Sequence, residues 1–138
     1  MSQRGSLTVE FAILVPAVML LFGVAVGGAR TWLARSTVEQ VAGAAARAAS
    51  LEYTPTAAVA AGERMARAQL AIGDVRCAPL SVAIDAHALN SPAGVPGKVT
   101  ATADCDVPLS DVLVPGWPGT MRVSASATAI LDTYRRRG

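Results

Sequence analysis

Residues 11–29 read FAILVPAVMLLFGVAVGGA and contain no charged side chain. Their length of about 19 residues matches the ~30 Å hydrocarbon thickness of a bilayer when they are coiled as a helix. A core helix of a soluble domain carries a polar stripe, whereas this stretch is apolar all round. The sequence therefore predicts one membrane-spanning helix here, in preference to the buried helix of a soluble protein.

The residues directly before this stretch carry a second pattern. Residues 4–11 read RGSLTVEF, with Gly5 separated by four residues from Glu10, which an aromatic residue follows. This arrangement resembles the type IV prepilin cleavage box, in which a membrane peptidase cuts after the glycine. The resemblance implies cleavage between Gly5 and Ser6, which leaves Glu10 at the fifth mature position and Phe11 beside it. A lone G-x-x-x-x-E recurs by chance, but directly before a span it is specific.

Over residues 4–50 the chain resembles the TadE branch, the pseudopilins or minor pilins of the tight-adherence (Flp) pilus system, and Pro16 inside the span is part of the likeness. The resemblance implies a structural protein without enzymatic activity that helps to initiate or cap a pilus. It implies a prepilin peptidase, other pilin subunits, inner-membrane assembly proteins and membrane lipid as partners. It also implies a single-pass protein of the cytoplasmic membrane with its head outside the cytoplasm. Whether the subunit enters the filament stays open.

The same resemblance implies a role for Glu10 in assembly. Its partner would be the N-terminal amine of an adjacent subunit, because a buried charge without a partner is strongly unfavourable. The alternative is an acid that is merely tolerated at the edge of the membrane, where its cost is modest.

Two features favour other interpretations. A cleaved secretory signal is one competitor, since residues 23–29 offer small side chains for a cleavage site, although the apolar run is long for that role. The second feature is the charge on either side of the span. Arg4 precedes it while Arg30 and Arg35 follow it, so the positive-inside tendency by itself favours the reverse orientation. The alternative function is a membrane-anchored or signal-cleaved extracytoplasmic binding protein unrelated to pili.

The composition argues against several other classes of function. The net charge is +2, which gives no broad basic face for nucleic acid. His87 is the single histidine, and neither cysteine lies in a C-x-x-C pair, so we expect no metal and no cofactor. No catalytic set is evident, and a lone histidine is more often structural than a base. In an exported head, Cys77 and Cys105 are expected to form a disulfide.

Periodicity and turn residues predict an α+β fold: a long N-terminal transmembrane, pilin-like helix, then a second helix packed on a small three-stranded antiparallel sheet. Thr56 is the expected N-cap of the second helix, at about residues 57–72, and Gly73 ends it. The expected strands are residues 75–86, 98–107 and 121–131, with a turn of helix at 109–113. The expected division is a leader at 1–5, a transmembrane segment at 6–29, a helix continuation at 30–50 and an extracytoplasmic head at 51–138.

If the first two strands pair as a hairpin, the two cysteines lie symmetrically about Ser91 and face one another. The inward positions change from odd (Val75, Cys77) to even (Val82, Ile84), which predicts a bulge near Pro79.

Several further residues have two interpretations. Asp104, Asp106 and Asp111 are expected to be solvated carboxylates and not a calcium site, because their spacing matches no EF-hand. Trp117 either caps the head core, the favoured interpretation, or is an exposed recognition aromatic. The small residues of 43–49 pack either on other pilin helices or on the protein's own head. Arg135–Arg137 are expected to be a solvated tail and not a contact with anionic lipid or another subunit, because three arginines are few for a lipid-binding cluster.

Overall fold

The computed structural model describes residues 6–134 and confirms the predicted α+β fold. In chain order, the elements are α1 (Ser6–Ser50), α2 (Pro55–Ile72), β1 (Leu80–Asp85), the 3₁₀ helix η2 (His87–Asn90), β2 (Gly97–Pro108), the single turn α3 (Leu109–Val112) and β3 (Thr120–Leu131). The expected leader at residues 1–5 and the tail arginines lie outside the described residues.

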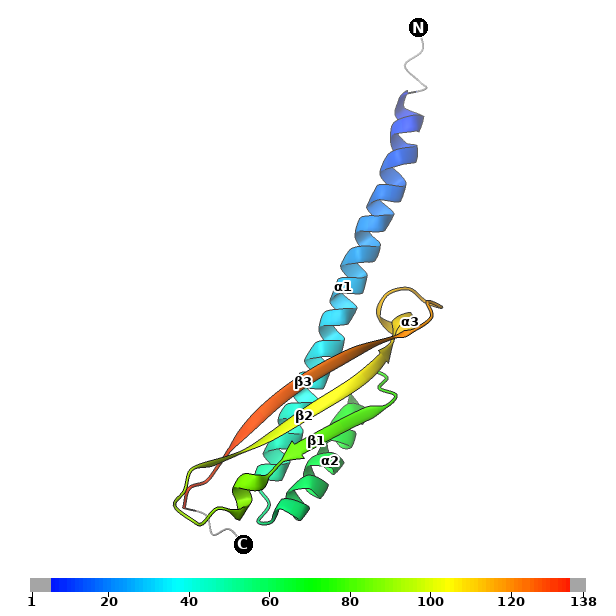
Figure 1. Cartoon of the computed structure of the whole chain (residues 1–138). Helices are drawn as coiled ribbons and strands as arrows, with labels where there is room; N and C mark the ends of the chain where they lie inside the picture. Colours follow the sequence, from blue (N-terminus) through cyan, green and yellow to red (C-terminus); the bar gives the residue numbers. More distant parts are fainter. Residues whose placement is uncertain (1–5, 135–138) are drawn as a thin grey trace.

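The helix α1 dominates the shape of the molecule. It runs unbroken through Pro16 for 45 residues, which corresponds to about 68 Å at 1.5 Å per residue. Its N-terminal half projects from the head as a single rod, while its C-terminal half lies against the sheet (Figure 1). One helix thus supplies both the apolar stretch and a main element of the head.

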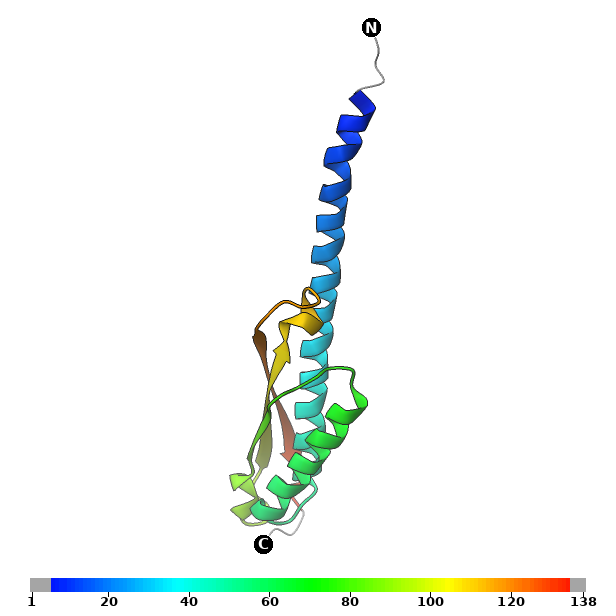
Figure 2. The ribbon, with the colours of Figure 1, turned by 90° about the vertical axis from the view of Figure 1, so that its right-hand side faces the viewer.

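The head has two layers, with α1 and α2 on one face of the sheet (Figure 2). The strands lie in the order β1-β2-β3, all antiparallel. The helix α1 covers β2 and β3, while α2 packs against α1 and β1. The core between the layers consists mainly of alanine and valine, and its largest fully buried side chains are Val38, Val41, Val99, Val107, Val112 and Cys105. Small side chains bury little area each, so the core is thin.

Packing on the head explains three of the six small residues of 43–49, and also Ala42 before them. Ala42, Ala45, Ala46 and Ala49 are almost completely buried between α1 and the rest of the head. The interpretation that these residues pack on the protein's own head is therefore the one that the structure supports for them. Gly43 lies on the half-exposed side of the helix.

The outer face of the sheet is polar and is linked across β2 and β3. Thr100 pairs with Thr128, Thr102 donates to Ser126, and Ser124 donates to Asp104. These pairs lie directly opposite one another in the strand register. Cross-strand pairs of this kind, with alternating buried alanines on the other face, fix the register of a sheet.

The start of α2 differs from the expectation. Thr54, not Thr56, is the N-cap: its side chain accepts a hydrogen bond from the backbone N–H of Ala57, and Pro55 is the first helical residue. Proline suits that position because its missing N–H has no partner in the first turn. Gly73 ends the helix as expected, although in an extended and not a left-handed conformation.

The inward side of α2 consists of small residues. Its buried residues are Ala58, Ala61, Gly62 and Ala66, whereas Met65 is 43% exposed. Small side chains let α2 approach α1 closely, which a methionine at the contact would prevent.

The first strand is shorter than expected and its register differs. It begins at Leu80, which lies opposite Cys105, so Cys77 does not face Cys105 as a directly paired strand residue. The register is displaced by three residues from the one that is symmetric about Ser91, in which Cys77 would lie opposite Cys105. An extra residue also precedes the strand: the N–H of Ala78 donates to the Asp106 carbonyl, and the N–H of Asp106 donates to the Pro79 carbonyl. Ala78 and Pro79 thus both lie opposite Asp106, which is a β-bulge. The change of the inward positions from odd to even residue numbers predicts a bulge at this place.

Candidate functional site in the N-terminal helix

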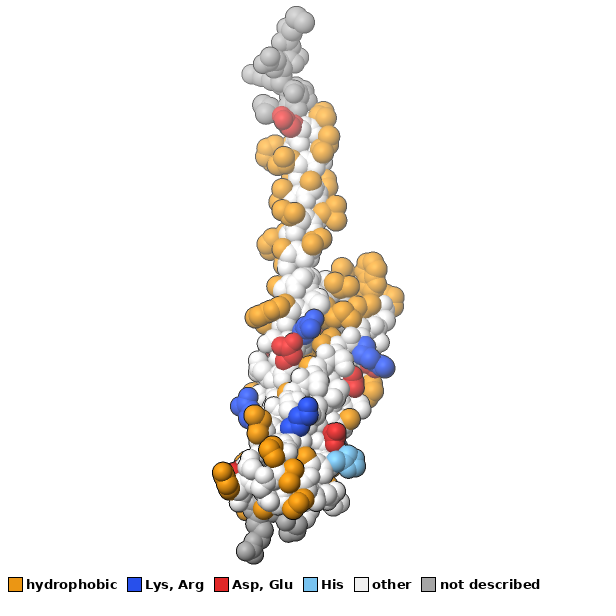
Figure 3. All heavy atoms as spheres, turned by 60° about the vertical axis from the view of Figure 1, so that its left-hand side comes forward, with side chains coloured by type: hydrophobic (Ala, Val, Ile, Leu, Met, Phe, Trp, Pro, Cys, Tyr) orange, Lys and Arg blue, Asp and Glu red, His pale blue; other side chains and the backbone are white. Residues whose placement is uncertain are grey.

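The free half of α1 is an exposed apolar surface. From Val9 to Val24 its large side chains are mostly more than half exposed, and apolar side chains cover the helix in the view of Figure 3. By length and composition this helix is able to cross a membrane, and none of its most apolar window is buried in the protein. Contiguous apolar surface of this extent marks a membrane or protein interaction site.

The residues of the expected cleavage box lie at the free end of this helix. Gly5 is outside the described residues, Ser6 is the first residue of α1, and Glu10 and Phe11 follow within the next two turns. Both Glu10 and Phe11 are exposed and lie far from the head. Peptidase access and pairing of Glu10 with another subunit remain predictions.

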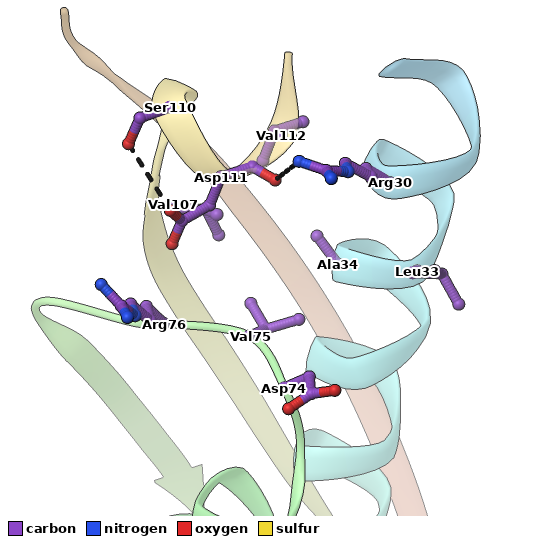
Figure 4. A pocket seen from close by; sticks show the side chains of 10 residues that line it. All are labelled: Arg30, Leu33, Ala34, Asp74, Val75, Arg76, Val107, Ser110, Asp111 and Val112. Carbon is purple, nitrogen blue, oxygen red and sulfur yellow. Dashed lines mark hydrogen bonds between the residues drawn. The ribbon is translucent and has the colours of Figure 1, made fainter. Parts of the chain in front are cut away.

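A polar site marks the point where α1 enters the head. The Arg30 guanidinium donates to the backbone carbonyl of Asp111, with 3.2 Å between nitrogen and oxygen. Figure 4 shows Arg30 reaching from α1 toward Asp111, with Asp74 and Arg76 on the segment that connects α2 to β1. Together with Ser110 these residues line a cavity of about 450 Å³. The first charged side chain after the apolar stretch therefore ties α1 to the turn α3.

An apolar groove lies immediately on the other side of that polar site. It measures about 830 Å³ and lies between α1 and the loop that follows α3. Its lining is formed by Pro16, Met19, Leu20, Gly23, Val24, Gly27, Gly28 and Thr31 of α1 and by Leu113, Val114 and Trp117 of the loop. The side chain of Leu113 lies against Gly27, where a Cβ atom would come within 3.4 Å of Leu113 Cδ2.

Trp117 belongs to this groove and not to the core. Its side chain is 55% exposed, so the favoured expectation that it caps the head core is wrong. Sequence reasoning also missed Leu113 and Val114, although the sequence offers a signal: large apolar residues inside the proline- and glycine-rich loop LVPGWPG. Such a loop cannot bury them in a regular element of its own.

The expected disulfide is present. It joins Cys77, in the segment between α2 and β1, to Cys105 of β2, with 5.2 Å between the Cα atoms. Cys105 is fully buried, and Cys77 packs against the same core cluster. The bond therefore ties the irregular segment after α2 to the middle strand.

The three neighbouring acids Asp104, Asp106 and Asp111 each accept a side-chain hydrogen bond. Asp106 accepts two hydrogen bonds from the Arg122 guanidinium, with 3.1 Å for the shorter. The hydrogen bond to Asp106 and the charge of Asp106 raise the pKa of Arg122. Asp104 accepts from Ser124, and Asp111 accepts from Ser110. In the part of the chain that the structure describes, no three potential ligands form a metal-binding group.

The fold and this site define a class: a protein with one apolar helix able to cross a membrane, continuous with a small α+β head. Within that class, residues 5–47 match the family model described as TadE-like protein. The match confirms the resemblance over nearly all of α1 and points to a protein associated with the tight-adherence pilus. No curated protein and no solved structure matches the chain.

Proposed function

We propose that this chain is a minor pilin, or pseudopilin, that takes part in initiating or capping a Flp-type pilus. A prepilin peptidase cuts it after Gly5, and residues 6–29 hold it in the cytoplasmic membrane until assembly. Its partners are other pilin subunits and the inner-membrane proteins that assemble the pilus. Its role is structural, without catalysis of its own.

The observation that carries this proposal is the continuity of α1. One helix joins the residues of the expected cleavage box to the core of the head without a break or a linker. A subunit built this way can pass from bilayer to filament with its helix intact, because both surroundings accept the same apolar surface. The family match over residues 5–47 falls on this helix.

The disulfide supports an orientation with the head outside the cytoplasm. Disulfides persist in oxidising compartments and are rare in the cytosol. The bond between Cys77 and Cys105 therefore favours export of the head, whereas the arginines that follow the span favour the reverse orientation. We give the disulfide more weight, because the expected cleavage box before the span favours the same orientation.

Deletion and complementation test the proposal. Cells that lack the chain should lose their Flp-type pili, counted by electron microscopy, and the full chain should restore them. If pili form normally without the chain, the alternative of an anchored extracytoplasmic binding protein unrelated to pili takes its place.

A further inference from the structure

We propose that residues 113–118, which we call the apolar loop, insert into the outer interface of the bilayer and hold the head against the membrane surface before assembly. This inference rests on the proposed function in one respect, namely that α1 spans the membrane. The partner is lipid, at the level of the headgroups and the first part of the acyl chains.

The first argument is the position of the apolar loop along α1. Leu113 packs on Gly27, and the groove between loop and helix extends toward the free half of α1. Leu113, Val114 and Trp117 are each about half exposed. In Figure 3 apolar side chains gather on the tip of the head beside the rod of the helix. The exposed apolar surface of the head is thus continuous with the surface that would contact lipid.

The second argument is a shared boundary between apolar and polar residues. On α1, no charge occurs between Glu10 and Arg30, a separation of 20 residues or about 30 Å, which equals the hydrocarbon thickness. On the head, the charged Asp111 lies two residues before the apolar loop. The hydrogen bond from Arg30 to Asp111 places both boundaries at the same level. If the membrane surface lies at the level of Arg30 and Asp111, the apolar loop lies on the side of that surface where the lipid is.

The third argument is the chemistry of the apolar loop. Tryptophan is enriched at membrane interfaces, where its ring contacts lipid and its N–H stays wet. Pro115 and Pro118 have no backbone N–H to desolvate. The N–H groups of Leu113 and Trp117 donate to the carbonyls of Leu109 and Val114. These bonds lower the cost of moving an irregular backbone into the interface, where water still reaches the remaining groups.

Lipid fits this surface better than a second copy of the chain. The groove faces the half of α1 that a bilayer would surround, so acyl chains reach it without any further assembly step. A helix from a second copy of the chain would instead occupy the groove only after the subunits have assembled. Covering of the loop by protein is therefore one outcome of the test.

Tryptophan fluorescence of the full chain in lipid vesicles tests the inference. Trp32→Phe leaves Trp117 as the sole tryptophan, and Trp32 is exposed, so its replacement disturbs no core. We expect emission shifted to the blue and strong quenching by lipids that carry a spin label near the headgroup end of the acyl chain. Acrylamide in the water should quench it weakly.

The matched control moves the single tryptophan to the other end of the sheet. The variant Trp32→Phe, Trp117→Phe, Ile130→Trp carries it at an exposed position near the end of β3, where we expect strong quenching by acrylamide and no quenching by lipid. Formation of the disulfide, read from intact mass, confirms folding of each variant.

If the chain floats with the vesicles and Trp117 behaves like the control, the inference is wrong while the membrane span stands. Shielding of Trp117 from both quenchers means that protein covers the loop, which also overturns it. Failure of the chain to float with vesicles overturns the span and the inference together.

Discussion

Glu10 is the residue on which the assembly mechanism depends. It lies exposed near the free end of α1, and the described residues of the protein offer it no partner in the head, which begins some 30 Å away at 1.5 Å per residue. After cleavage, the new amine of Ser6 would lie on the same helix, about 6 Å from Glu10 along the axis. When subunits leave the membrane and pack together, both charges lose water, and pairing between neighbouring subunits offsets much of that cost.

We therefore predict that Glu10→Ala inserts into the membrane normally but fails to support pilus assembly. Membrane fractionation measures insertion, and pilus counts measure assembly. Glu39→Ala is the matched control, because Glu39 is an exposed acid on the same helix whose ion pair with Arg35 is a surface pair of little energetic value. Normal pili with Glu10→Ala, in cells that need the chain for pili, would contradict the pairing.

The disulfide is the second feature at the residue scale. It closes a loop with a sequence separation of 28, which corresponds to roughly 3–4 kcal/mol in the chain-entropy account of disulfide stability. We predict that the double variant Cys77→Ala, Cys105→Ala lowers the free energy of unfolding of the head by about this amount, measured by urea titration in detergent. An unchanged urea midpoint would show that the thin core suffices without the bond.

At the scale of elements, the contact between α1 and α2 depends on a glycine. A Cβ atom at Gly62 would collide with the Ile84 side chain and come within 3.2 Å of the Ala45 carbonyl oxygen. We predict that Gly62→Ala destabilises the head by about 1–3 kcal/mol, the usual cost of overpacking, even though alanine is the better helix former.

The control for this prediction is Gly43→Ala in α1. A Cβ atom there meets only the end of Arg47, at an ordinary 3.8 Å. The substitution should leave packing intact and stabilise the helix by up to about 1 kcal/mol, since glycine is the poorer helix former. Urea titration of both variants gives the comparison, and equal effects of the two substitutions would refute the packing argument.

The same scale shows how far the sequence predicts the structure. Apolar periodicity predicted α1, the three strands and the change of phase before β1, because each depends on neighbours in the chain. It did not predict the pairing of Leu80 with Cys105, because that register depends on the connection between β1 and β2, which contains η2 and whose path apolar periodicity does not encode. The Thr54 cap was predictable, since Pro55 is favoured at the first helical position.

Part of the candidate site, too, was predictable from the sequence and part was not. Glu10, Phe11 and the apolar stretch were evident from the sequence because they form one continuous pattern. The apolar groove was not, because Leu113 and Trp117 come from an irregular loop whose position beside Gly27 is set by β2, α3 and the hydrogen bond from Arg30. No local pattern encodes a contact between residues that lie more than eighty positions apart.

At the scale of the whole molecule, one continuous helix connects a membrane-compatible surface to a head closed by a disulfide. The proposed pilin function requires that this helix begin at Ser6 in the mature protein. A cleaved secretory signal would instead remove the apolar half of α1 and leave a soluble head. The two accounts thus differ in which residue stands first.

The N-terminus of the mature protein is the most direct test of the central claim. Intact mass and N-terminal sequencing of the chain from piliated cells should give Ser6, and a Gly5→Val variant should keep its leader. A mature chain that begins near residue 30, or one that retains residues 1–5 in cells with an active prepilin peptidase, would contradict the proposed function.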